Sequence, residues 1–81
     1  MAGEMPLANL RPGQRARICG LAAAGEMRRR LQDIGLIEGT EVACLMRSPL
    51  GDPVAYAIRG AVIALRKSDS STVMVEEATV R

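Results

Sequence analysis

The chain has 81 residues, enough for one small domain, and its formal charge of +2 comes from 11 basic and 9 acidic residues. Because the acidic and basic residues are interleaved along the sequence, this balance does not demand a nucleic-acid partner. The sequence contains no histidine, which excludes a Ser-His-Asp triad and a histidine-based acid–base pair.

The hydropathy pattern points to a protein that works in the cytoplasm. No apolar run approaches the roughly 20 residues that a membrane span needs, and the opening residues MAGEMPLANL do not resemble a secretory signal. We therefore expect a cytoplasmic protein with no direct membrane insertion. In such a reducing compartment Cys19 and Cys44, which form no Cys-x-x-Cys pair, are expected to be free thiols.

The first 21 residues predict a tail, one helical turn and a strand. Residues 1–6 are expected to form a loose N-terminal tail. Leu7 and Leu10 are three residues apart and precede a Pro-Gly turn, which predicts a single helical turn that places both leucines in the core. The alternation in RARICGL, residues 15–21, then predicts a half-buried strand.

A helix is predicted over residues 24–34, where the period of the apolar residues changes. At about 100° per residue, one stripe of this helix carries the residues expected to anchor it, Met27, Leu31 and Ile34. Gly35 stands where a helix C′ glycine belongs, and Leu36 follows it. This spacing predicts a Schellman ending, in which a left-handed glycine is accompanied by contact between Leu31 and Leu36.

Beyond residue 40 the apolar residues recur at every second position, which predicts four further strands. The residues expected to face inward, strand by strand, are Val42, Cys44 and Met46; Val54, Tyr56 and Ile58; Ile63 and Leu65; and Val73 and Val75. Gly51, Asp52 and Pro53 are expected to form a rigid tip, and Arg59-Gly60 a tight turn.

These elements predict a mostly β fold, a small barrel of about five short antiparallel strands with one inserted helix. A sheet of this size removes its edges by curling into a barrel. Residues 7–77 are expected to form this barrel as a single domain.

Four short motifs carry a resemblance to a known family. In chain order they are Leu7, Leu10 and Gly13; Arg30, Leu31, Gly35, Leu36 and Gly39; Gly51, Asp52 and Pro53; and Gly60, Leu65 and Arg66. Each motif alone is weak, but in this order and spacing, from about Leu7 to Glu76, the sequence resembles the ferrous iron transport protein A family, FeoA.

The resemblance implies an SH3-like β-barrel with an inserted helix and a cytosolic accessory role in bacterial ferrous iron uptake. The implied partner is the membrane transporter FeoB, whose cytosolic part carries a GTPase domain. The chain has no room for the winged-helix DNA-binding domain that metal-dependent repressors join to this fold, so it resembles the free-standing form.

The residues themselves predict a protein that is not an enzyme and needs no cofactor. A Gly-rich phosphate loop followed by Lys-Ser or Lys-Thr is missing from the sequence. Two isolated cysteines without histidine cannot make a closed tetrahedral metal site in one chain, so Fe²⁺ and Zn²⁺ are expected to bind only weakly.

Two alternatives to transporter docking are a stand-alone metal-responsive regulatory barrel and a small nucleic-acid-binding barrel. Small barrels that bind nucleic acid usually stack bases on exposed aromatic side chains. The only aromatic residue here is Tyr56, and its alternation with Val54 and Ile58 places it in or near the core. This argues against nucleic acid as a partner.

The basic residues give a hypothesis for the docking site. On the predicted helix, Glu26 precedes Arg30 by four residues and Arg29 precedes Asp33 by four residues, so each acid is the expected partner of one arginine. Arg28 has no carboxylate at this spacing. The fourth predicted strand ends in two further cations. We therefore expect partner binding to involve Arg28, Arg66 and Lys67. The alternative is apolar surface near Leu21, Leu36 and Leu45.

Overall fold

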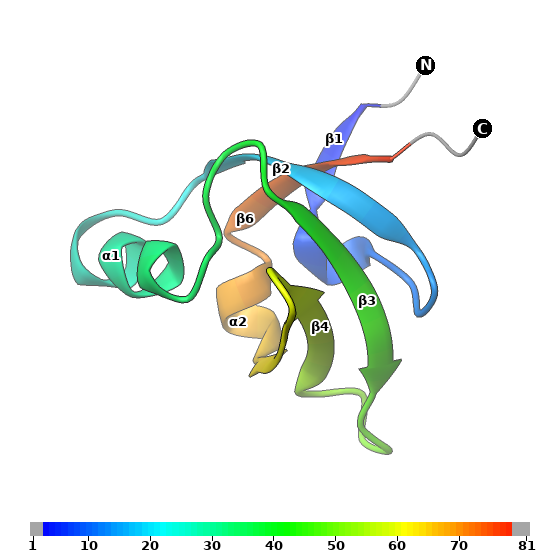
Figure 1. Cartoon of the computed structure of the whole chain (residues 1–81). Helices are drawn as coiled ribbons and strands as arrows, with labels where there is room; N and C mark the ends of the chain where they lie inside the picture. Colours follow the sequence, from blue (N-terminus) through cyan, green and yellow to red (C-terminus); the bar gives the residue numbers. More distant parts are fainter. Residues whose placement is uncertain (1–2, 79–81) are drawn as a thin grey trace.

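Six antiparallel strands form one curled sheet in the computed structural model, which describes residues 3–78 (Figure 1). The strands are β1 (Glu4–Pro6), β2 (Arg15–Leu21), β3 (Glu41–Arg47), β4 (Val54–Ile58), β5 (Ala61–Leu65) and β6 (Val73–Glu77). Their order across the sheet is β1-β6-β2-β3-β4-β5, so β1 and β5 are its two edges. The predicted mostly β fold is confirmed, with six strands in place of about five.

The additional strand, β1, lies in the segment that the sequence predicts as a loose tail. Glu4, Met5 and Pro6 pair antiparallel with residues 74–76 in the middle of β6, and the half-buried Met5 packs against the core. The prediction for these residues is wrong because a three-residue strand is too short to show an alternating pattern.

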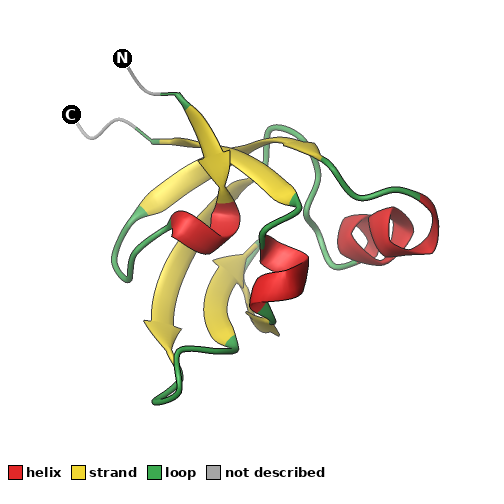
Figure 2. Cartoon of the chain, turned by 180° about the vertical axis from the view of Figure 1, so that it is seen from behind, coloured by secondary structure: helices red, strands yellow, loops and turns green. Residues whose placement is uncertain are grey.

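Three helical segments connect the strands. The 3₁₀ turn η1 (Leu7–Asn9) is the predicted helical turn and buries Leu7. Helix α1 (Gly25–Asp33) is the predicted inserted helix. In the chain it comes between β2 and β3, and in space it stands beside the sheet (Figure 2). A single turn, α2 (Lys67–Ser70), lies where the serine-rich segment predicts only a break between strands.

The end of α1 has the predicted Schellman geometry. The Leu36 amide donates to the Leu31 carbonyl at 3.0 Å, and the Gly35 amide donates to the Gln32 carbonyl at 3.0 Å. Gly35 has a φ of +106°, which is costly for residues that carry a Cβ. The chain therefore leaves α1 in a fixed direction, and Leu36 is completely buried against the sheet.

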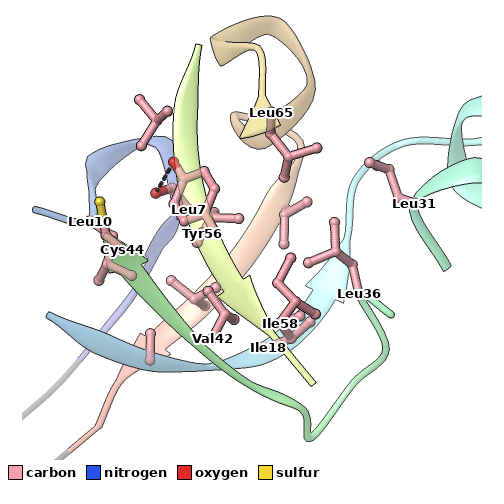
Figure 3. Close-up of a cluster of buried hydrophobic side chains, with 14 residues drawn as sticks. Leu7, Leu10, Ile18, Leu31, Leu36, Val42, Cys44, Tyr56, Ile58 and Leu65 are labelled. Atoms are coloured by element: carbon pink, nitrogen blue, oxygen red, sulfur yellow. Dashed lines mark hydrogen bonds between the residues drawn. The ribbon is translucent and has the colours of Figure 1, made fainter. Parts of the chain in front are cut away.

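The buried side chains of the strands meet inside the curl, together with leucines from η1 and α1 (Figure 3). The buried positions confirm most of the inward-facing residues predicted for the last four strands: Val42, Cys44, Val54, Tyr56, Ile58, Leu65, Val73 and Val75. Tyr56 is fully buried, and its hydroxyl donates to the Leu7 carbonyl at 3.4 Å (Figure 3). Burial raises the pKa of this hydroxyl.

Met46 departs from the predicted alternation. A bulge in β3 shifts the pairing, so that Cys44 lies opposite Tyr56 while Met46 lies opposite Ala55. The extra residue turns Met46 to the outer face, where its side chain is 63% exposed. The prediction that Met46 faces inward is therefore wrong.

Candidate interaction surface

The outer face of the sheet divides into a charged half and an apolar half. In the charged half, cross-strand pairing aligns one row over four strands, Glu4, Glu76, Arg17 and Glu41. Arg17 lies between two glutamates in this row, and opposite charges on paired strands attract each other by roughly 0.2–1 kcal/mol. Glu4, however, lies directly opposite Glu76, a pair of like charges, so this half is a solvated face that carries an excess of negative charge.

The apolar half covers β3, β4 and β5. The strand registers align Ala43, Ala57 and Val62 in one row and Met46, Ala55 and Ala64 in the next. We call these six residues the apolar face. Val62 is 70% exposed. The face arises because VAYAI and AVIAL place their larger residues inward and mostly alanine outward, which leaves a surface of small apolar side chains exposed to water.

A groove of about 310 Å³ continues the apolar face at the β3–β4 loop. It is lined mainly by apolar side chains of the strands and the loop: Met46, Pro49, Pro53, Ala55 and Ala64. Leu50, at the loop tip, is 94% exposed. Both the groove and this tip offer apolar surface to a partner.

Hydrogen bonds order this loop internally and join it to the beginning of α2. The Gly51 amide donates to the Ser48 carbonyl at 2.8 Å, and the Ser48 amide donates to the Pro53 carbonyl at 3.1 Å. The Asp52 carboxylate accepts the Lys67 backbone N–H at 2.8 Å. Asp52 therefore joins the predicted tip to the beginning of α2, a contact across 15 residues that local sequence patterns do not reveal.

The predicted docking residues lie on two separate elements. Arg66 and Lys67 are exposed where β5 passes into α2. Arg28 is on α1, and its guanidinium donates to the Leu21 carbonyl at 3.1 Å. This carbonyl lies at the end of β2 and takes one of the five N–H donors of the exposed guanidinium, so the other donors can still reach a partner.

The charge pairs expected within α1 are not formed as hydrogen bonds. Among residues 3–78, the side-chain hydrogen bond made by the arginines of this helix is the one from Arg28 to a backbone carbonyl. Arg29 and Arg30 are exposed, so their charges lie in water, where ion pairs contribute little to stability.

The alternative apolar surface is only partly available. Leu36 is completely buried and belongs to the core. Leu21 is half-buried and packs against the core, whereas Leu45 is 43% exposed at the bulge in β3. Only Leu45 therefore adds substantially to the exposed apolar surface, and it lies on the strand that carries Met46.

The two cysteines are free and have little thiolate character. Partial burial, followed by the negative charges of nearby glutamates, raises the pKa of the Cys19 thiol; these glutamates are Glu76, Glu4 and Glu38. Burial raises the pKa of the Cys44 thiol, partly opposed by Arg47. Within the described residues, no three metal-ligating side chains are placed to hold a metal ion.

We expect the two thiols to differ in alkylation by iodoacetamide. Cys44 should react only as fast as the chain unfolds, because its side chain is 1% exposed. At about pH 8, Cys19 should react faster than Cys44 but more slowly than the unfolded chain, because its raised pKa leaves less thiolate. Mass spectrometry of the labelled peptides measures both rates, with the chain in guanidinium chloride as the control. A Cys19 that reacts as fast as this control would contradict the expectation.

Comparison with known proteins decides the family. The model of the FeoA domain matches residues 5–77. The chain belongs to the FeoA domain family. The family that the four sequence motifs indicated is confirmed.

Relatives of this FeoA chain include a fusion protein and solved structures. The Fe(2+) transport protein A/Fe(2+) transporter FeoB fusion protein of Porphyromonas gingivalis is 32% identical over 72 residues. The match covers 89% of this chain and 8% of the fusion protein. The chain thus spans a small fraction of the length of that relative.

Two solved structures share the fold of this FeoA chain. The FeoA protein from Chlorobium tepidum has a TM-score of 0.86 and 33% identity, covering 93% of this chain and 71% of that one. Stenotrophomonas maltophilia FeoA complexed with zinc, described as an SH3 domain protein, has a TM-score of 0.78 and 27% identity over 88% of each chain. The SH3-like fold implied by the resemblance is confirmed.

The apolar face was missed by sequence reasoning, although its signal is present. Residues 54–58 and 61–65 place alanine or valine at the positions between their inward residues, where a solvated strand normally carries polar side chains.

Within residues 3–78, no helix combines the length and the apolar character that crossing a bilayer requires.

Proposed function

We propose that this FeoA chain is a non-enzymatic, cytosolic accessory protein of bacterial ferrous iron uptake that binds the cytosolic part of a FeoB-type transporter. The observation that carries the proposal is the Porphyromonas gingivalis fusion, in which a sequence similar to this chain is part of one protein with FeoB. Fusing two modules raises their effective concentration for each other, an arrangement that suits partners acting in contact.

The mechanism that suits such a protein is a shift between conformations of its partner. A protein that performs no chemistry changes a transporter only by binding one of its conformations more tightly than another. The transporter's cytosolic part is the natural target, and the nucleotide bound there would decide which conformation is available.

The surface that best suits docking combines the apolar face with the cations beside it. Protein interfaces commonly have an apolar centre and a polar rim. Here the centre would be the exposed Val62 and Met46 with the adjoining groove, and the rim would include Arg66 and Lys67. Arg28, on α1, is a separate part of the hypothesis because it already binds a backbone carbonyl.

The test is retention of FeoB from detergent-solubilised membranes by the immobilised chain. We expect the transporter to be retained, with a difference between a GTP analogue and GDP. If neither condition retains it, the proposed function is wrong.

Charge reversal tests the rim in the same assay. Arg66→Glu combined with Lys67→Glu should lower retention by about threefold or more at low salt and by less at high salt, because salt screens rim charges. Arg28→Glu, alone and added to the pair, tests the third residue. Arg29→Glu combined with Arg11→Glu is the control, since both residues are exposed and the change in net charge is the same. Undiminished retention, with folding intact, would remove the three residues from the docking site.

A further inference from the structure

The edge strand β5 has backbone groups available for another strand. A two-residue turn at Arg59-Gly60 joins β4 to β5, so Ile58 and Ala61 form the first hydrogen-bonded pair. In an antiparallel ladder these pairs alternate, which directs the backbone N–H and C=O groups of Val62 and Ala64 away from β4. In residues 3–78, β5 pairs only with β4, and these outward groups have no backbone partner.

The other edge of the sheet is protected, whereas β5 is not. Proteins blunt edge strands with short length, charged residues, proline or bulges. Strand β1 has three of these features, since it is only 3 residues long and contains Glu4 and Pro6. Strand β5 is AVIAL, five apolar residues in regular pairing with β4, and three of them are exposed. An unprotected apolar edge is a template for strand pairing.

The charges beside β5 disfavour a second copy of the chain as the added strand. Antiparallel pairing of two β5 strands over all five residues is centred on Ile63. It places Arg59 of one copy beside Lys67 of the other, and Gly60 beside Arg66, at both ends of the pair. The Asp52 carboxylate, which accepts the Lys67 backbone N–H, keeps its negative charge and offsets only part of the three cations that meet at each end. Like charges on adjacent strands are destabilising.

The same charges favour a partner strand with acidic ends. Arg59 precedes β5, and Arg66 and Lys67 follow it, so carboxylates at either end of an added strand would meet cations. Between these ends, alternate side chains of the added strand would lie beside Val62 and Ala64 and extend the apolar face. The alanines leave room for a large apolar side chain to reach the groove at Met46.

We propose that β5 is the docking strand for an extended segment of a partner protein, apolar at alternate residues and acidic at its ends, which adds to the sheet as a seventh strand. This inference goes beyond the proposed function, because it concerns how a segment binds whichever protein supplies it. It is tested on the isolated chain, so its failure would leave the transporter experiment unaffected.

The probe is the synthetic peptide Glu-Glu-Val-Thr-Leu-Thr-Val-Glu-Glu, blocked at both ends. Binding is followed by titration of the ¹⁵N-labelled chain in NMR spectra. We expect amide hydrogen exchange to slow at Val62 and Ala64, and to change little at Ile63, whose amide already donates to β4. The same peptide with lysine in place of glutamate should bind at least about tenfold more weakly.

Backbone methylation of the probe separates strand addition from simple apolar contact. Two peptides are made, each N-methylated on one of the two alternating sets of residues. Only one set faces β5 in an added strand, so one peptide should lose about tenfold or more in affinity and the other should bind nearly as the parent does. Equal affinities for all three peptides would overturn the proposal, and this comparison needs no change in the protein.

The matched protein variants are Ala64→Pro and Ala64→Ser. Proline removes the outward N–H of Ala64 while leaving the hydrogen bonds between β5 and β4, so it should weaken the probe about tenfold. Serine keeps the N–H and should bind within about twofold of the wild type. The proposal is also overturned if neither the acidic nor the basic peptide binds at millimolar concentration, or if the Val62 and Ala64 amides become protected by self-association without peptide.

Discussion

Leu31→Ala should lower the free energy of unfolding by about 2–4 kcal/mol. Leu31 is the only residue of α1 that is fully buried, and its side chain is 2% exposed. The other two residues of the stripe, Met27 and Ile34, are half-buried and pack against the edge of the core. Because α1 stands beside the sheet, truncating its deepest side chain removes the main apolar contact that holds it there (Figure 3).

Denaturant titration of the wild type and the variant measures this loss. Leu45→Ala is the control, since it makes the same chemical change at a side chain that is 43% exposed. The control should lose less than about 1 kcal/mol, because it leaves little apolar surface uncovered and no closed cavity. A loss below about 0.5 kcal/mol for Leu31→Ala would show that the stripe contributes little to folding and is available to a partner.

The features predicted correctly are those that short sequence patterns specify. The glycine after the apolar stripe of α1 identifies the end of the helix, because Gly35 and Leu36 complete a motif within five residues of Leu31. Alternation identifies the inward residues of β4 and β5, because residues two apart in a strand face the same side. The turn between them follows from Arg59-Gly60, both of which have positive φ.

The features that were missed depend on contacts between distant segments. The bulge that exposes Met46 is visible only in the pairing of β3 with β4. The hydrogen bonds of Arg28 to a carbonyl and of Asp52 to the beginning of α2 join elements whose proximity local patterns do not give. The open edge at β5 is a property of strand order. The cations beside β5 could be identified from the sequence, but the apolar strand between them could not be assigned to an edge.

Gly35→Ala should cost about 2–4 kcal/mol of stability, for two reasons that a second variant separates. The first is the backbone, since a φ of +106° is unfavourable for any residue with a Cβ. The second is space, since a Cβ at Gly35 would lie 3.1 Å from Cγ2 of Ile58 and 3.2 Å from Cδ of Arg59. Ile58 is buried in β4 and cannot move without disturbing the core, whereas the Arg59 side chain can swing aside.

Gly39→Ala isolates the backbone contribution. Gly39 has a φ of +91°, and a Cβ there would meet no atom within 4 Å. We therefore expect this variant to lose only about 1–2 kcal/mol, so that the difference between the two variants measures the contact with Ile58. Denaturant titration of both variants under identical conditions gives this difference. Equal losses would mean that β4 accommodates the added methyl group. A larger loss at Gly35 would show that the close packing of the end of α1 on the β4–β5 turn contributes to folding, and that α1 and the edge hairpin are stabilised together.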